Sequence, residues 1–443
     1  MLALLVAVSS VVRFLVLALR LQTPMYLPDE YTYSALARSI AETGRPTIRG
    51  ASAHFPALLE PILAAPFWLT HDPQLALRLT QAEHSILMSL GAVPVYFLCR
   101  RLGLGSGFAL SACVLTLASA DLSYASYVMA EPVAFPLVLA TVYAAVVALQ
   151  SPSRRAQLAL LGLIALATFA RLQLVVLAPV VIVAALALER FNVRRVLSKC
   201  GVLLAGLAIL TAAALATGPQ RVLGTYQGVV ALHATAGTVL HQTALHLMLF
   251  VFVSSIVLLP GALVGLANGV ARPQSTEEQA FAWLTVLLGA AVIAEAVFVG
   301  STVSGNFGER YLIYVVPLLA PAFGLYARRG GGRAAALCLS AVFALVALRF
   351  PLTHYTDHSS DSPLLWAVSR VQLGLGSVNG ALVIGAVGLV LALIAAAVGL
   401  RPQRRSPGQV TFGPGRFREE GSCMMLSGPF APFLQSIPDY ALF

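Results

Sequence analysis

The chain has 443 residues, of which 58% are hydrophobic and only 10% are charged, and its mean hydropathy is +0.85. Soluble domains carry about 25% charged residues, so the composition excludes them and indicates an integral membrane protein. The net charge of +10 follows from the tendency of basic residues to collect in cytoplasmic loops, so nucleic acid is not an expected partner.

Apolar stretches of about twenty residues recur along the chain, and this is the length of a transmembrane helix. They predict an all-α membrane protein with about 12 transmembrane helices, within a range of about 10 to 13, plus two amphipathic interfacial helices in the first outer loop. The first stretch has no basic n-region and no small-residue cleavage site, so we interpret it as a retained span. The predicted spans are 1–20, 80–99, 104–120, 133–149, 158–170, 173–188, 200–217, 244–268, 280–299, 311–327, 334–350 and 380–400.

The distribution of charge predicts the orientation of these spans. If the N-terminus is inside, the double-basic clusters, such as Arg100–Arg101 and Arg328–Arg329, all fall in cytoplasmic loops. We therefore expect a multi-pass protein of the cytoplasmic (inner) membrane, with residues 1–405 forming one polytopic domain. Residues 406–443 are rich in Gly, Pro and Ser without periodicity, which predicts a disordered cytoplasmic tail.

The first outer loop, residues 21–79, carries two adjacent acids, Asp29 and Glu30. Short helices are predicted over 30–42 and 56–69, and the second of them lies at or dips into the interface. The acids have two explanations. They can stabilise the start of a helix, where the dipole favours negative charge. They can also take part in chemistry, because ionised groups near a membrane are costly and are usually functional.

A second acid, Glu131, lies at the mouth of another span in the sequence MAEPVAF. Two acidic sites at one membrane face allow a general base and a group that binds a cation or a sugar hydroxyl. Arg171 at an outer turn and Arg310 in Gly-Glu-Arg-Tyr lie on the same predicted face. Their ordinary explanation is that an Arg at a span end reaches the headgroups, or that Glu309 and Arg310 pair with each other.

Weaker candidates lie among the remaining polar residues. His54, between the two interfacial helices, could line a pocket, although a histidine in a loop is usually solvated. Glu295 lies inside a predicted span, where facing lipid would cost about 3 kcal/mol, so we expect it to face the protein interior. Glu83 and His84 are either pocket-lining residues or interfacial polar contacts.

Five segments in chain order resemble motifs of one enzyme family. They are PDEYTYSALARSI, FPALLEPILAAPFW, ALRLTQAEHSILMSLGAVPVYFLCRRLG, MAEPVAFPL and GERYLIYVVPLLA. Over residues 1–330 the chain is similar to the C-type (GT-C) glycosyltransferases, multi-pass enzymes that take sugars from polyprenyl-phosphate donors. The group includes protein O-mannosyltransferases, lipid A aminoarabinose transferases and cell-wall arabinofuranosyltransferases.

The resemblance implies a role for each candidate residue. Asp29 would be the general base that deprotonates the acceptor hydroxyl, and Glu30 would assist through hydrogen bonding or cation binding. Glu131 would bind the acceptor, a sugar hydroxyl or a metal. A divalent cation, if the enzyme uses one, would then be held by Glu30 and Glu131. The other implied substrate-binding residues are Arg310 and Arg171, which would neutralise the leaving phosphate, together with Glu309, His54 and Tyr31.

The implied partners are the polyprenyl-phosphate sugar donor, membrane lipid, and a glycan, lipid or protein acceptor outside the cytoplasm. Many relatives carry a C-terminal soluble domain that this sequence is not expected to have, so acceptor recognition would fall to the outer segments 218–243 and 351–379. Two other interpretations remain open. A secondary transporter of 12 spans usually shows related halves and charges at the midplane, and a non-catalytic relative would only bind lipid-linked sugars.

Overall fold

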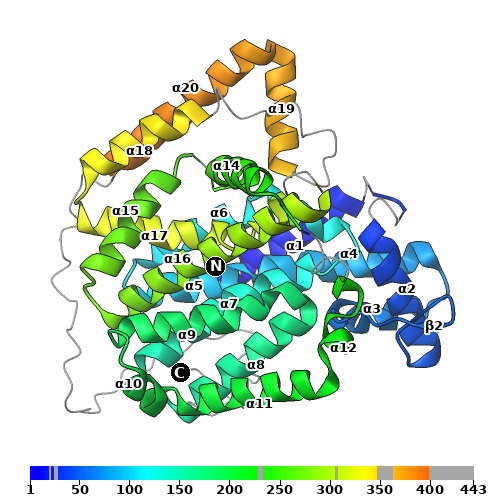
Figure 1. Cartoon of the computed structure of the whole chain (residues 1–443). Helices are drawn as coiled ribbons and strands as arrows, with labels where there is room; N and C mark the ends of the chain where they lie inside the picture. Colours follow the sequence, from blue (N-terminus) through cyan, green and yellow to red (C-terminus); the bar gives the residue numbers. More distant parts are fainter. Residues whose placement is uncertain are drawn as a thin grey trace, which may run out of the picture. The chain divides into compact units, whose positions relative to one another are not determined.

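A computed structural model of the chain describes residues 1–18, 21–23, 28–227, 233–254, 256–304, 308–346 and 363–398. The predicted tail, residues 406–443, lies outside the described residues. The described part is a set of packed helices with one small hairpin (Figure 1), in which β1 (Thr47–Ile48) pairs antiparallel with β2 (Ala51–Ser52). The prediction of an all-α membrane protein is confirmed.

The N-terminal elements bring the first loop and the early spans together. In chain order they are α1 (Leu2–Ala18), α2 (Pro28–Thr43), α3 (Leu59–Trp68), α4 (Pro73–Leu90), α5 (Ala92–Arg101), α6 (Ser106–Leu117), the 3-10 helix η1 (Ala120–Ser126), α7 (Glu131–Gln150), α8 (Arg154–Ala170), the 3-10 helix η2 (Leu172–Val176) and α9 (Leu177–Leu188). The two predicted interfacial helices correspond to α2 and α3, which pack against each other.

The C-terminal elements complete the bundle. They are α10 (Val193–Lys199), α11 (Gly201–Thr217), α12 (Pro219–Leu223), η3 (Gly224–Tyr226), α14 (Ala236–Val253), α15 (Leu259–Ala271), α16 (Thr276–Val299), the π-helical turn η4 (Gly300–Ser304), η5 (Glu309–Tyr311), α17 (Val316–Arg329), α18 (Arg333–Val346), α19 (Pro363–Leu375) and α20 (Ser377–Val398). The span expected to begin at residue 311 thus becomes helical only at Val316.

By length and composition, five of the described helices can cross a membrane, or seven if each of two bent pairs counts as one span. Several other predicted spans correspond to shorter apolar helices, so the predicted number of about 12 remains a prediction. The single span predicted over 244–268 is wrong, because α14 ends at Val253 and α15 begins at Leu259. Pro260 explains the new start, since proline has no N–H to donate and clashes with the preceding turn.

Closely packed glycines let two helices approach one another. Gly261 and Gly265 lie one turn apart on α15, facing Phe323 and Ala322 of α17, and a Cβ at either glycine would collide with those residues. In membranes, where lipid tails are as apolar as leucine, this approach supplies the packing that holds helices together. It fixes α17, which follows the site segment 308–315 in the chain.

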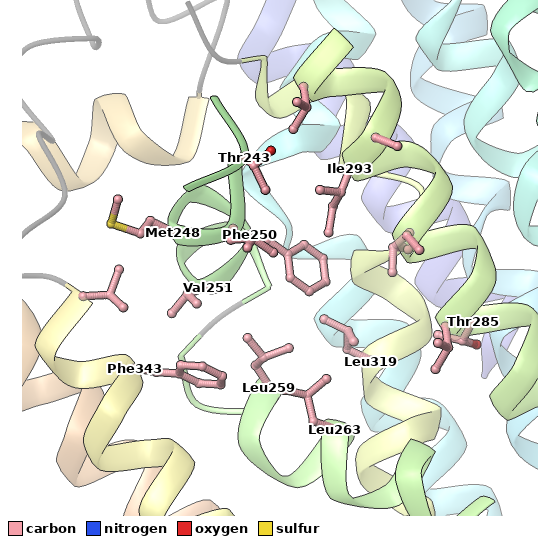
Figure 2. Close-up of a pocket in the computed structure, with 18 of the residues that line it drawn as sticks. Thr243, Met248, Phe250, Val251, Leu259, Leu263, Thr285, Ile293, Leu319 and Phe343 are labelled. Carbon is pink, nitrogen blue, oxygen red and sulfur yellow. The ribbon is translucent and has the colours of Figure 1, made fainter. Parts of the chain in front are cut away.

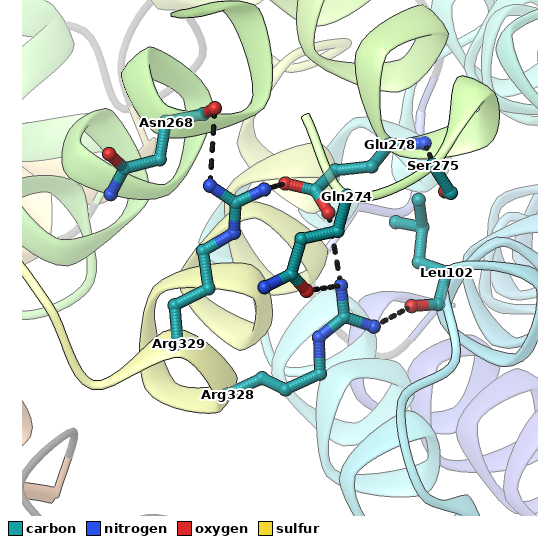
Figure 3. Close-up of polar contacts among 7 residues, drawn as sticks. All are labelled: Leu102, Asn268, Gln274, Ser275, Glu278, Arg328 and Arg329. Atoms are coloured by element: carbon teal, nitrogen blue, oxygen red, sulfur yellow. Dashed lines mark hydrogen bonds and ion pairs between the residues drawn. The ribbon is translucent and has the colours of Figure 1, made fainter. Parts of the chain in front are cut away.

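A second fixed point lies at the N-terminal end of α16 (Figure 3). Glu278 is 1% exposed and pairs with both Arg328, at 3.1 Å, and Arg329, from the last turn of α17. The two arginines also donate to the backbone carbonyls of Leu102 and Asn268. This cluster, which we call the arginine clasp, ties together α15, α16, α17 and the turn after α5.

Candidate active site

A cavity of about 270 Å³ lies where the first loop meets the C-terminal end of α16. The residues around it come from elements far apart in the sequence, namely α2, α7, η2, η3, α16, η4 and η5, and from the segments between them. Its lining is formed by Asp29, Tyr33, Phe55, Ala130, Glu131, Arg171, Gln173, Tyr226, Val299, Val303, Arg310 and Tyr311. Four of the candidate site residues thus border one cavity, although their roles remain predictions.

The first ion pair of the cavity joins Asp29 and Arg310. Asp29 lies in the first turn of α2, directly after Pro28, where a carboxylate is favoured by the positive end of the helix dipole. Arg310 Nη1 lies 2.8 Å from the Asp29 Oδ2 atom. The Arg310 side chain is 30% exposed and that of Asp29 is 47% exposed, so this pair is accessible to a ligand.

The second ion pair joins Glu131 and Arg171 and is buried. Glu131 is the first residue of α7, and Arg171 lies in extended backbone between α8 and η2. Arg171 Nη1 is 2.6 Å from Glu131 Oε1, and the side chains are only 6% and 4% exposed. Arg171 also donates to the Tyr314 hydroxyl at 3.0 Å and lies over the Tyr311 ring, 4.9 Å from its centre.

Glu30 points away from this cavity. It is fully buried, and its carboxylate accepts a hydrogen bond from the backbone N–H of Val128 at 3.0 Å. Two side chains of α4 hold the adjacent backbone, because Gln81 donates to Ser126 O and His84 Nδ1 lies 3.0 Å from Tyr127 O. Glu30 therefore helps to fix the segment that ends at Glu131, and it is not among the residues that line the cavity.

Glu309 also lies away from the cavity, although its neighbour Arg310 lines it. Its carboxyl is buried close to that of Asp121 and accepts a hydrogen bond from the backbone N–H of Leu364 at 3.3 Å. Burial, followed by the nearby Asp121, raises the pKa of Glu309 well above its ordinary value. The suggested pair between Glu309 and Arg310 is not formed, because Arg310 pairs with Asp29.

The remaining candidates lie beside the cavity rather than in it. His54 is exposed, and it is the next residue, Phe55, that lines the cavity. The Tyr31 hydroxyl accepts a hydrogen bond from Arg49 at 3.0 Å. Of the two tyrosines on α2, Tyr33 faces the cavity, because it lies four residues after Asp29 and so shares its helix face.

Two lining residues, Phe55 and Gln173, carried no signal as site residues in the sequence. Phe55 packs edge-on against Tyr33, with ring centres 5.3 Å apart, and lies 6.4 Å from Tyr226 of the segment predicted to recognise the acceptor. Gln173 accepts a hydrogen bond from Arg171. These aromatic rings form a wall suited to the apolar face of a sugar, and only the fold brings them together.

The donor set for a metal is incomplete in the described part of the chain. No group of three His, Cys, Asp or Glu side chains is arranged there to hold an ion. Glu30 is engaged by Val128 and Glu131 by Arg171, so the expected pairing of these two acids around a cation does not fit.

Comparison with known proteins identifies the fold. No family model and no curated protein matches the sequence. Among solved structures, the chain is similar to ArnT from Cupriavidus metallidurans bound to undecaprenyl phosphate, with a TM-score of 0.52 and 15% identity over 90% of this chain and 77% of that one. The apo state of the same protein matches with a TM-score of 0.52 and 16% identity over the same shares.

At this level of identity the likeness shows the fold alone. The chain therefore has the fold of the GT-C glycosyltransferases, as the resemblance of its motifs implied.

Proposed function

We propose that this protein is a glycosyltransferase that moves a sugar from a polyprenyl-phosphate-linked donor to an acceptor on the extracytoplasmic side of the membrane. The observation that carries the proposal is the cavity in which Asp29 and Glu131 meet Arg171 and Arg310. Carboxylates can take a proton from an acceptor hydroxyl, and guanidinium groups can stabilise the charge that develops on a leaving phosphate. The positive-inside distribution of basic residues supports the side on which it acts.

A large apolar cleft beside the cavity supports a lipid-linked substrate (Figure 2). It has a volume of about 980 Å³ and is lined by residues of α14, α15, α16, α17 and α18, including Phe250, Ile293 and Phe343. The end of α16 and η4 separate the two spaces, because Val299 and Val303 line the polar cavity while Phe298 and Ser301 line the cleft. An isoprenoid chain in the cleft would have its phosphate close to this boundary.

The similar protein ArnT was crystallised with undecaprenyl phosphate, which is the product that transfer from such a donor would leave. In the proposed reaction, the Asp29 carboxylate accepts the proton of the acceptor hydroxyl as its oxygen attacks the anomeric carbon. The bond from that carbon to the phosphate oxygen breaks, and the polyprenyl phosphate leaves.

The test is transfer of labelled sugar by membranes that contain the protein. Polyprenyl-phosphate-linked mannose, arabinose and aminoarabinose, each with a radiolabelled sugar, are supplied with a crude cell-envelope extract as acceptor. With the wild type, we expect the labelled sugar of one donor to be transferred to acceptors in the extract. Asp29→Asn should reduce the rate of this transfer by about 10²–10⁴-fold, the usual contribution of a general base.

Glu42→Gln is the matched control, because Glu42 lies on the same helix but pairs with Arg38 in solvent. Equal rates for wild type and Asp29→Asn would remove Asp29 from the mechanism. Saturable sugar flux into proteoliposomes that contain no lipid donor would favour the transporter instead.

A further inference from the structure

The two arginines of the cavity differ in how much of their hydrogen-bonding capacity is already used. Arg171 is 6% exposed and donates to Glu131, Tyr314 and Gln173. Arg310 is 30% exposed, donates to Asp29 through Nη1 and lies over the Tyr311 ring at 5.4 Å. A guanidinium has five N–H donors, so Arg310 retains more capacity to bind an oxyanion than Arg171 does.

The charges around the cavity favour exchange of one ion pair. The two carboxylates and two guanidinium groups that line it are balanced, so an arriving phosphate must compete with a carboxylate for a cation. Taking Arg171 would leave Glu131, which is 4% exposed, buried without its partner, and this is costly. Taking Arg310 leaves Asp29, which is 47% exposed, in contact with water at little cost.

We propose that the phosphate of a polyprenyl-phosphate ligand replaces Asp29 as the partner of Arg310. The inference rests on the proposed function and adds an order of events to it. When the donor binds, Asp29 loses its ion-pair partner, and its carboxylate is free to contact the acceptor hydroxyl. The base is therefore released only when a lipid-linked phosphate occupies the cavity.

The exchange also accounts for both products of the reaction. As the new bond to the anomeric carbon forms, the acceptor proton moves to Asp29 and the electron pair of the broken bond stays on the phosphate oxygen. The polyprenyl phosphate gains one negative charge and binds Arg310 more strongly, while protonated Asp29 no longer competes for it. Loss of the proton from Asp29 restores the original ion pair and helps to expel the lipid phosphate.

The test measures binding rather than turnover, with farnesyl phosphate as the probe and detergent-solubilised full-length protein. If Asp29 competes with the phosphate, Asp29→Asn should tighten binding by about two- to fivefold, the effect of removing a partly exposed ion pair. Arg310→Gln should weaken binding by about tenfold or more. In the double variant the gain from Asp29→Asn should disappear, because no cation remains to be released.

Three controls separate this exchange from other causes. Glu42→Gln removes the same charge from α2, about 20 Å along the helix, and should leave the affinity unchanged. Farnesol has the tail without the phosphate, so its binding should not respond to Asp29→Asn. Inorganic phosphate should show the same relative gain at a lower affinity, and a gain for inorganic phosphate alone would overturn the assignment to a lipid-linked phosphate.

Unchanged or weaker binding of farnesyl phosphate by Asp29→Asn would overturn the exchange. If that variant does not fold, as judged by its thermal transition and gel-filtration profile, Asp29→Ser provides the same measurement. Failure of the exchange is distinguishable from failure of the proposed function. Sugar transfer by the wild type without tighter binding in Asp29→Asn would contradict only the ion-pair exchange. Tighter binding in Asp29→Asn without transfer from any donor would contradict only the proposed glycosyltransferase function.

Discussion

The two ends of α16 use the same residue types in opposite ways. At its N-terminal end, in the arginine clasp, Glu278 is 1% exposed and receives two arginines that also bind backbone carbonyls (Figure 3). At the other end, the cavity holds Asp29 and Arg310, both partly exposed, with one contact between their charged atoms. The clasp saturates its charges with protein groups, while the cavity leaves them available to a ligand.

This difference teaches how to separate a structural ion pair from a functional one in a chain with few charges. Both sets lie at the ends of apolar helices and look alike in the sequence, as an acid and an arginine beside a span. The distinction lies in what surrounds them, because a saturated pair stabilises the fold and an unsaturated pair next to a cavity can exchange partners.

The largest effect expected from this comparison is on stability. Glu278→Gln should lower the free energy of unfolding by about 3 kcal/mol, near the low end for breaking a buried pair, because Arg328 is 27% exposed. Asp29→Asn should lower it by less than about 1 kcal/mol, as expected for a partly exposed pair. Denaturant unfolding in mixed micelles measures both.

Binding of farnesyl phosphate should show the reverse order, with Glu278→Gln unchanged and Asp29→Asn tighter. If the two variants lost equal stability, the distinction between clasp and cavity would fail. Glu42→Gln serves as the reference for removing an exposed acid.

A smaller effect is expected at Glu30, which contrasts with its neighbour Asp29. Because Glu30 holds the backbone N–H of Val128 and so positions Glu131, Glu30→Ala should lower kcat for sugar transfer by about tenfold to a hundredfold. Glu30→Gln retains an oxygen that can accept this hydrogen bond and should recover most of the rate. A loss as large for Gln as for Ala would show that the negative charge itself is needed, as in catalysis or cation binding.

The sequence was sufficient to predict the fold class, the two interfacial helices and four residues that line the cavity. Asp29 lies in the first turn of α2 and Glu131 begins the apolar helix α7, while Arg171 and Arg310 lie just outside apolar runs. Charges in these positions must face either water or each other, because lipid excludes them. Their convergence was a reasonable expectation, and the cavity contains all four.

What the sequence could not resolve is the direction in which neighbouring residues point. Adjacent positions in a helix diverge by about 100°, so Asp29 and Glu30 face different surroundings, and so do Glu309 and Arg310. Only the packing partners decide which of the two faces the cavity. The contact between Phe55 and Tyr226 likewise joins segments about 170 residues apart, which no local pattern records.

The smallest effect is expected from Glu309, the buried neighbour of Arg310. Its raised pKa means that, above the ordinary pKa of a glutamate near about 4.3, the folded protein keeps a proton that the unfolded chain has lost. The contribution of Glu309 to the free energy of unfolding is therefore fully present below the ordinary pKa of a glutamate. It declines as the pH rises toward the pKa of Glu309 in the folded protein. Glu309→Gln removes this dependence, because an amide does not titrate.

The difference in unfolding free energy between wild type and Glu309→Gln should consequently change with pH in one direction. Relative to the wild type, the variant should become more stable from pH 4 to pH 8, in melts recorded at constant ionic strength. Because Arg310 follows Glu309 in η5, farnesyl phosphate binding reports whether the cavity is disturbed, and we expect it to be unchanged. A pH dependence identical to that of the wild type would mean that Glu309 is ionised in the folded protein and that its pKa is not raised.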